Sequence, residues 1–268
     1  MSRTAICVFL LLAISGLASA GTVTLNGECL VRNVSSNSIA FSLSNSGNDS
    51  AYSLVLTPVI QGSQSVVGAY TANLLGPLSN VTFALNFTNI TERGEHPAYM
   101  LLAYQQGTSV FTATFPCVIP FGNTTVSKVL ISSNVTPLSN GTFAIRVGAF
   151  NEGSQPVVAN VLLALPPSFT YADQDSYHVD LAPYAVQNVT FVVTPPGYSS
   201  QASFGSAAFA TYSLDNLSYT SMDPFTVVIA PPGALAGPIL FYAAGAATVA
   251  VLALILLSVW RRSRRPKA

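Results

Sequence analysis

The chain contains an internal repeat, and this repeat most constrains what the chain can fold into. The segment IAFSLSNSGNDSAYSLVLTP, from Ile39, resembles IRVGAFNEGSQPVVANVLLALP, from Ile145, and both pass through Asn-x-Gly into a polar turn. The segment LLGPLSNVTFALNFT, from Leu74, matches VDLAPYAVQNVTFVVTP, from Val179, through Leu-x-Pro and Asn-Val-Thr-Phe. The repeat therefore predicts two similarly folded units of about 100 residues each.

Apolar and polar residues alternate with a period of two inside both units. The stretches SIAFSLSN, VTFALNFT, GTFAIRVGAF and VTFVVTP show the pattern, with Gly, Pro, Asn and Ser between them. This alternation is typical of strands that bury one face. We predict an all-β fold class of two tandem Ig-like antiparallel β-sandwiches, at residues 21–120 and 121–233, plus one transmembrane α-helix.

The first twenty residues have the order of a secretory signal peptide. Arg3 precedes an apolar stretch, and Ala18-Ser19-Ala20 forms a small-x-small cleavage site. Such a segment is short for a membrane span. We predict that residues 1–20 are a signal peptide cut after Ala20, with a retained N-terminal anchor as the alternative.

A second apolar segment lies near the other end. Residues 239–260 carry no charge, and their roughly 33 Å of helix would cross a hydrocarbon core of about 30 Å. Half of the chain's ten Lys and Arg follow at once, as Arg261, Arg262, Arg264, Arg265 and Lys267. We predict a transmembrane helix over 234–260 and a cytoplasmic tail over 261–268, which places residues 21–233 outside the cell. Removal of the anchor by a sorting enzyme remains the alternative.

The exported part is acidic, because residues 21–233 hold four bases against ten acids, a formal charge of −6. The basic tail lacks the aromatic and structured context of a nucleic-acid site. We expect the partners to be the bilayer and an envelope, matrix or partner ectodomain protein. We expect neither a nucleic acid nor a small-molecule substrate.

Two cysteines remain after removal of the signal peptide, Cys29 and Cys117. An exported segment with two cysteines has one possible internal pairing, and its compartment favours oxidation. We predict a disulfide between the first and last strands of the first sandwich, with two buried thiols as the alternative.

Ten Asn-x-Ser/Thr sequons indicate a glycosylated surface, where chance would give about three or four. They begin at Asn33, Asn48, Asn80, Asn86, Asn89, Asn123, Asn134, Asn140, Asn188 and Asn216.

Chemistry-bearing clusters are few. Asp173, Asp175 and Asp180 lie in one acidic stretch beside His178, and their oxygens form a weak candidate Ca²⁺ site without EF-hand spacing. A solvated loop is the alternative, and we predict neither a metal nor another cofactor. His96, beside acidic residues, is interpreted as part of a loop before a strand. No catalytic residue is predicted, and we do not expect an enzyme.

The order Asn-x-Gly, alternating strand, Leu-x-Pro and Val-Thr-Phe strand resembles the immunoglobulin-like modules called CARDB and NEW3. The resemblance covers most of residues 35–120 and 128–230, as a tandem pair on a C-terminal membrane anchor. It implies a stalk or adhesion module without catalysis and transfers no binding residue. A weaker resemblance is to the α and β subunits of the translocon-associated complex, from which the doubled domain departs.

These features together predict a single-pass surface glycoprotein of the cell membrane with a structural or adhesive role, as a stalk or envelope contact. The alternative is a non-catalytic accessory subunit of a membrane complex, such as a transporter, translocon or surface enzyme.

Overall fold

The computed structural model describes residues 21–30, 38–61, 65–66, 69–88, 90, 92–122, 125–197 and 202–229. The predicted signal peptide, transmembrane helix and basic tail lie outside these residues, as do the sequons at Asn33, Asn89 and Asn123. No helix within the described ranges is long and apolar enough to cross a membrane. Most described strand residues belong to one compact unit, and a second unit comprises Gly197–Ser203 and Val228–Ala268.

All the described regular structure is β-strand, which confirms the predicted all-β class. Eight strands precede residue 122 and form what we call the first half. They are β1 (Leu25–Leu30), β2 (Ser38–Asn45), β3 (Ala51–Ile60), β4 (Ser65–Val66), β5 (Tyr70–Leu75), β6 (Ser79–Thr88), β7 (Arg93–Gln106) and β8 (Ser109–Phe121).

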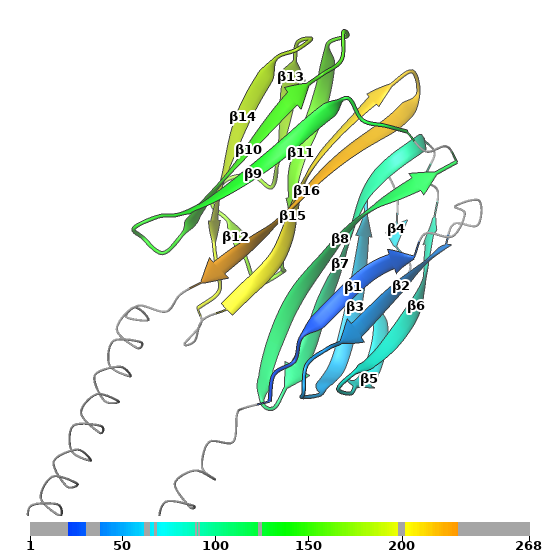
Figure 1. The fold of residues 1–268 in the computed structure, drawn as a ribbon, viewed down its shortest axis with the longest axis vertical. Coiled ribbons are helices and arrows are strands. Elements are labelled where there is room, and N and C mark those ends of the chain that lie inside the picture. Colours follow the sequence, from blue (N-terminus) through cyan, green and yellow to red (C-terminus); the bar gives the residue numbers. More distant parts are fainter. Residues whose placement is uncertain are drawn as a thin grey trace, which may run out of the picture. The chain divides into compact units, whose positions relative to one another are not determined.

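The next eight strands form the second half (Figure 1). They are β9 (Val129–Pro137), β10 (Phe143–Asn151), β11 (Val157–Ala164), β12 (Thr170–Tyr171), β13 (Ser176–Leu181), β14 (Val186–Thr194), β15 (Ala202–Leu214) and β16 (Leu217–Ile229).

The strand order is the same in both halves, as the sequence repeat requires. One four-stranded sheet has the order β1-β2-β6-β4, and another has the order β12-β14-β10-β9, so β1-β2-β6 corresponds to β9-β10-β14. A larger sheet contains β5-β3-β7, with β8 on β7, and β13-β11-β15-β16. Each half therefore supplies a small sheet and one portion of the large sheet, as expected of an Ig-like β-sandwich.

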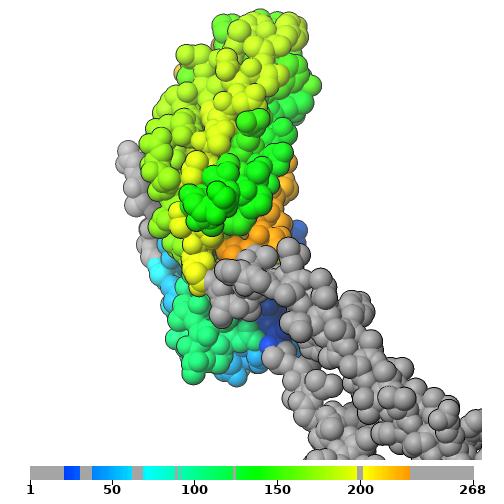
Figure 2. Space-filling view, turned by 90° about the vertical axis from the view of Figure 1, so that its left-hand side faces the viewer, coloured from blue at the N-terminus to red at the C-terminus, as the bar shows by residue number. Residues whose placement is uncertain are grey.

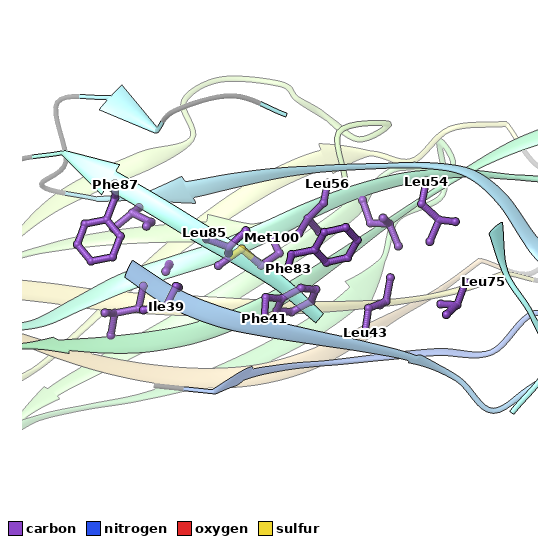
Figure 3. Packing of buried hydrophobic residues seen from close by; sticks show 14 of the residues in the cluster. Ile39, Phe41, Leu43, Leu54, Leu56, Leu75, Phe83, Leu85, Phe87 and Met100 are labelled. Carbon is purple, nitrogen blue, oxygen red and sulfur yellow. The ribbon is translucent and has the colours of Figure 1, made fainter. Parts of the chain in front are cut away.

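The alternating residues form the core of the first half. Along β2 every second residue is buried, and these are Ile39, Phe41, Leu43 and Asn45. Figure 3 shows the β2 side chains packed with those of the neighbouring elements, in a single cluster that also includes Met100 of β7. Full burial of one large apolar side chain contributes about 1.5–3 kcal/mol, so this cluster is the main source of stability for the half.

The second half repeats the pattern. On β10 the buried residues include Ile145 and Val147, and on β14 they include Phe191 and Val193. Phe83 of β6 and Phe191 of β14, the phenylalanines of the two Asn-Val-Thr-Phe motifs, are both buried.

The large sheet is continuous across the two halves, which the sequence did not predict. The strands β16 and β7 pair in parallel over two residues, Leu217 with Arg93 and Ser218 with Gly94. A Cβ on Gly94, at φ +120°, would collide with the Ser218 carbonyl oxygen, so only glycine permits this approach. Ser218 Oγ donates to Glu95 O at 2.9 Å. We call this pairing the junction.

Candidate interaction sites

A disulfide joins Cys29 of β1 to Cys117 of β8, with Cα atoms 6.3 Å apart and a sequence separation of 88. The predicted pairing of the first and last strands of the first sandwich is therefore confirmed. Because β1 belongs to the small sheet and β8 to the large one, the bond connects the two sheets. In the chain-entropy model a loop of this length contributes about 4–5 kcal/mol.

A buried asparagine explains why Asn-x-Gly and Leu-x-Pro occur together in the repeat. Asn45, 1% exposed, ends β2. Its Nδ2 lies 2.7 Å from Asp49 O and 3.3 Å from both Leu75 O and Gly76 O. Its Oδ1 accepts from Gly47 N at 3.0 Å. One side chain thus connects the Asn-x-Gly turn to the Leu-x-Pro turn.

Asn151 does the same in the second half and is also 1% exposed. Its Nδ2 donates to Gln155 O at 2.8 Å, and Leu181 O and Ala182 O lie at 3.2 and 3.3 Å. Its Oδ1 accepts from Gly153 N at 2.8 Å. Every partner is 106 residues after its counterpart in the first half. We call Asn45 and Asn151 the anchor asparagines.

The Leu-x-Pro turns place a large residue in a left-handed conformation. Leu78 has φ +54° and Tyr184, its counterpart, has φ +59°. They are 86% and 68% exposed. A proline before a residue with positive φ is typical of a type II turn, which favours glycine at that position. Neither side chain is stabilised by burial, so each turn presents an exposed apolar or aromatic group at the cost of backbone strain.

In the first half the segment that leads into β1, residues 21–24, lies along the Asn-x-Gly loop. Ser46 N donates to Thr24 O at 2.8 Å, and Asn48 N donates to Thr22 O at 3.0 Å. Thr22 N donates in return to Asn48 Oδ1 at 2.7 Å. A Cβ on Gly47 would collide with Thr22 O, so the glycine of the motif permits this contact.

Gln106 of β7 fixes the beginning of the same segment. Its Nε2 donates to Gly21 O at 2.7 Å and to Asp49 Oδ2 at 2.9 Å. A Cβ on Gly21 would lie 2.8 Å from the Asp49 Cβ, so this position is tightly filled. The place where residues 21–22 lie against the loop is called the seat below.

The corresponding place in the second half is open. Of the bonds that hold residues 21–24, the described residues of the second half repeat the first alone, from Glu152 N to Lys128 O at 2.8 Å. Beyond it is a hollow of about 500 Å³, whose lining includes Val126, Tyr184 and Leu214. Tyr212 and Tyr219 also line it, stacked at 5.0 Å between ring centroids.

All seven sequon asparagines that the structure describes are exposed: Asn48, Asn80, Asn86, Asn134, Asn140, Asn188 and Asn216. The two buried anchor asparagines, by contrast, are not in sequons. Four of the exposed seven are in strands of the small sheets, two on β6, one on β9 and one on β14. Figure 2 shows one face of the second half, coloured green to orange. None of the described sequon asparagines is within a strand of the large sheet.

The acidic stretch does not form a metal centre among the described residues. Asp173, Asp175, His178 and Asp180 are all exposed. No group of three or more His, Cys, Asp or Glu side chains in the described ranges is placed to hold a metal ion. Burial raises the pKa of Tyr99, and the carboxylate of Asp175 raises it further by a smaller amount.

His96 is buried inside strand β7 and not in a preceding loop, so this interpretation was wrong. Its Nε2 lies 2.8 Å from Glu92 O. Strand β7 includes His96 because all of β8 pairs with it, as far as the pair of Gly94 and Phe121. Burial raises the pKa of the neighbouring Glu95.

No protein-family model matches the chain, and no curated protein matches it. Among solved structures, a mutant alpha-2-macroglobulin from Salmonella is similar, with a TM-score of 0.31 and 12% identity over 79% of this chain and 16% of that chain. An Escherichia coli alpha-2-macroglobulin activated by porcine elastase gives 0.30 and 12%, over 80% and 22% of the two chains. The YadV chaperone gives 0.29 and 10%, over 76% and 99%. The chain thus spans less than a quarter of these macroglobulins, and such TM-scores assign it to no family.

Proposed function

We propose that this chain is a single-pass surface glycoprotein with a structural or adhesive role, built from two tandem modules of the CARDB/NEW3 type. The signal peptide, the transmembrane helix over 234–260 and the basic tail are part of this proposal. The observation that carries it is the exposure of all seven described sequon asparagines, in a chain that also contains a disulfide between its sheets. Both features suit an oxidising compartment outside the cytoplasm.

A surface free of described sequons is the best candidate for partner contact. On the large sheet Leu74, Tyr52, Gln105 and Val110 are in register across β5, β3, β7 and β8. All four are exposed, and none is charged. In a neighbouring row Thr71 of β5 pairs with Val55 of β3, and both side chains are exposed. Exposed surfaces of uncharged, mainly apolar side chains are typical of protein contact surfaces.

The proposal is tested by measuring glycan occupancy and topology in the native host. We expect each used sequon to carry a mass that is lost in the matching Asn→Gln variant. Asn73→Gln, at an exposed asparagine outside any sequon, is the control and leaves the mass of the glycans unchanged. Protease added to intact cells should cut residues 21–233 and leave the tail uncut. An unmodified chain, or a tail cut from outside, contradicts the proposal.

The partner is tested by crosslinking in intact membranes followed by mass spectrometry. Crosslinks to envelope or matrix proteins from the surface around Leu74, Tyr52 and Val110 support the adhesive role. Stoichiometric crosslinks to a transporter, translocon or surface enzyme replace it with the accessory-subunit alternative.

A further inference from the structure

We propose that the hollow of the second half is a binding site for an extended peptide segment of another protein. The segment would lie there as residues 21–22 lie in the seat of the first half. The argument depends on the internal repeat and on the hollow itself, so it holds whether or not the chain has the adhesive role proposed above.

The seat of the first half shows how a peptide is held at this place in the fold. Asn48 N and Asp49 N both point to Thr22 O, at 3.0 and 3.2 Å. Their counterparts in the second half are Ser154 N and Gln155 N, 106 residues later. Both residues are exposed, and within the described part of the chain neither amide donates to a carbonyl. Two donors that the first half uses to bind a peptide carbonyl therefore have no carbonyl partner among the described residues of the second half.

The segment that leads into β9 does not fill the hollow because it is held at the junction. Thr125 is buried, and its Oγ1 donates to Ser218 O at 2.8 Å. Val126 follows it and is 78% exposed at the edge of the hollow. By the alignment of Lys128 with Thr24, Val126 takes the position of Thr22 in the chain. The described segment that leads into β9 is thus diverted away from Ser154 and Gln155.

The lining indicates which peptide would fit. Leu214 occupies the position of Gln106, and Gln155 that of Asp49, so the polar pair that encloses Gly21 in the first half is absent at this place. Tyr184 and Tyr219 add aromatic surface, and Tyr212, which is 4% exposed, packs behind Tyr219. A space of about 500 Å³ has room for a large side chain, and buried aromatic contacts supply much of the affinity at such sites. We infer an extended segment with an apolar side chain where the first half has Gly21.

Two labelled peptides test the proposal against the detergent-solubilised full chain by fluorescence anisotropy. The first, GTVTLN, copies residues 21–26, and the second carries the change Gly21→Phe. We expect the Gly21→Phe peptide to bind with a Kd below about 1 mM, and at least about ten-fold more tightly than GTVTLN.

Two glycine variants provide a matched pair. Tyr184→Gly relieves the positive φ and removes the ring from the hollow, so binding of the Gly21→Phe peptide should weaken about ten-fold. Leu78→Gly makes the same backbone change at the equivalent turn of the first half and should leave binding unchanged. Leu214→Gln restores the residue type of the first half and should reduce the preference for the Gly21→Phe peptide over GTVTLN.

Several results would overturn the site. Failure of both peptides to bind at millimolar concentration would do so, as would equal loss of binding in Tyr184→Gly and Leu78→Gly. Binding of an oligosaccharide mixture in place of the peptides, with the same sensitivity to Tyr184→Gly, would make the hollow a carbohydrate site. Crosslinks from the peptide to the Asn45 loop of the first half would show displacement of residues 21–24 and not occupation of the hollow.

Discussion

Replacement of the anchor asparagines by alanine is the sharpest test of how the two repeat motifs stabilise the fold. The Asn45 amide has two N–H groups for three nearby carbonyls, and its Oδ1 accepts from Gly47 N and, at 3.3 Å, from Thr24 N. About four hydrogen bonds are therefore lost in Asn45→Ala. At roughly 1 kcal/mol for each bond, the free energy of unfolding should fall by about 3–4 kcal/mol.

Asn151→Ala should cost somewhat less, about 3 kcal/mol, because Asn151 Oδ1 accepts one hydrogen bond fewer than Asn45 Oδ1. Lys128 N, the counterpart of Thr24 N, donates to Tyr212 Oη at 2.9 Å and not to the asparagine. The loss in Asn151→Ala is thus one bond smaller than in Asn45→Ala. A cost of this size is a large fraction of the total stability of an ordinary domain.

Urea-dependent pulse proteolysis of the full chain in detergent measures these costs, and the fragments show which half has unfolded. Asn73→Ala, at an exposed asparagine, is the control and should change the free energy by less than about 0.5 kcal/mol. If both anchor variants behave like this control, the anchor asparagines do not connect the motifs energetically and the argument fails.

Four further changes are measured in the same urea series. Cys29→Ser should cost about 4 kcal/mol and make migration insensitive to reductant, and an unchanged midpoint would contradict the chain-entropy account. Gly94→Ala should cost more than about 2 kcal/mol and increase hydrogen exchange in β16, because its Cβ collides with the junction; protection equal to wild type would show that the junction is not formed. Leu78→Gly should stabilise the first half by about 1 kcal/mol through relief of its positive φ, and a loss of stability would mean that its side chain makes a contact. Burial raises the pKa of Glu95 above 4.5. The free energy of unfolding that its protonation contributes is therefore greatest below that pH and is lost as pH rises through the folded-state pKa. Glu95→Gln should remove this decline, and an identical pH profile in both proteins would refute it.

The sequence predicted the features that depend on local periodicity. The alternation along SIAFSLSN places Phe41 and Leu43 inward because a strand turns every second side chain to one face. The repeat predicted that Asn45 and Asn151 occupy equivalent places, although not that each binds the following Leu-x-Pro turn. That contact joins residues about 30 positions apart, and no period in the sequence reports it.

The junction and the end of β7 could not be predicted for a related reason. Parallel pairing over only Arg93 and Gly94 leaves no alternating pattern. The charged residues around His96 are typical of a loop, yet pairing with β8 carries them into the strand. Tertiary contacts therefore override the local signal where the two halves meet.

The comparison of the two halves separates what the fold needs from what distinguishes each half. Both retain the buried asparagine, the glycine two residues later and the proline turn, because these make the same hydrogen bonds 106 residues apart. Both also retain a stacked aromatic pair, Tyr104 with Phe111 and Tyr212 with Tyr219. The pair that encloses Gly21 in the first half, Gln106 and Asp49, is not retained, because Leu214 and Gln155 stand in its place. The hydrogen-bonded framework around the seat is thus repeated while the residues that enclose Gly21 are not, and a different occupant in the second half explains this combination.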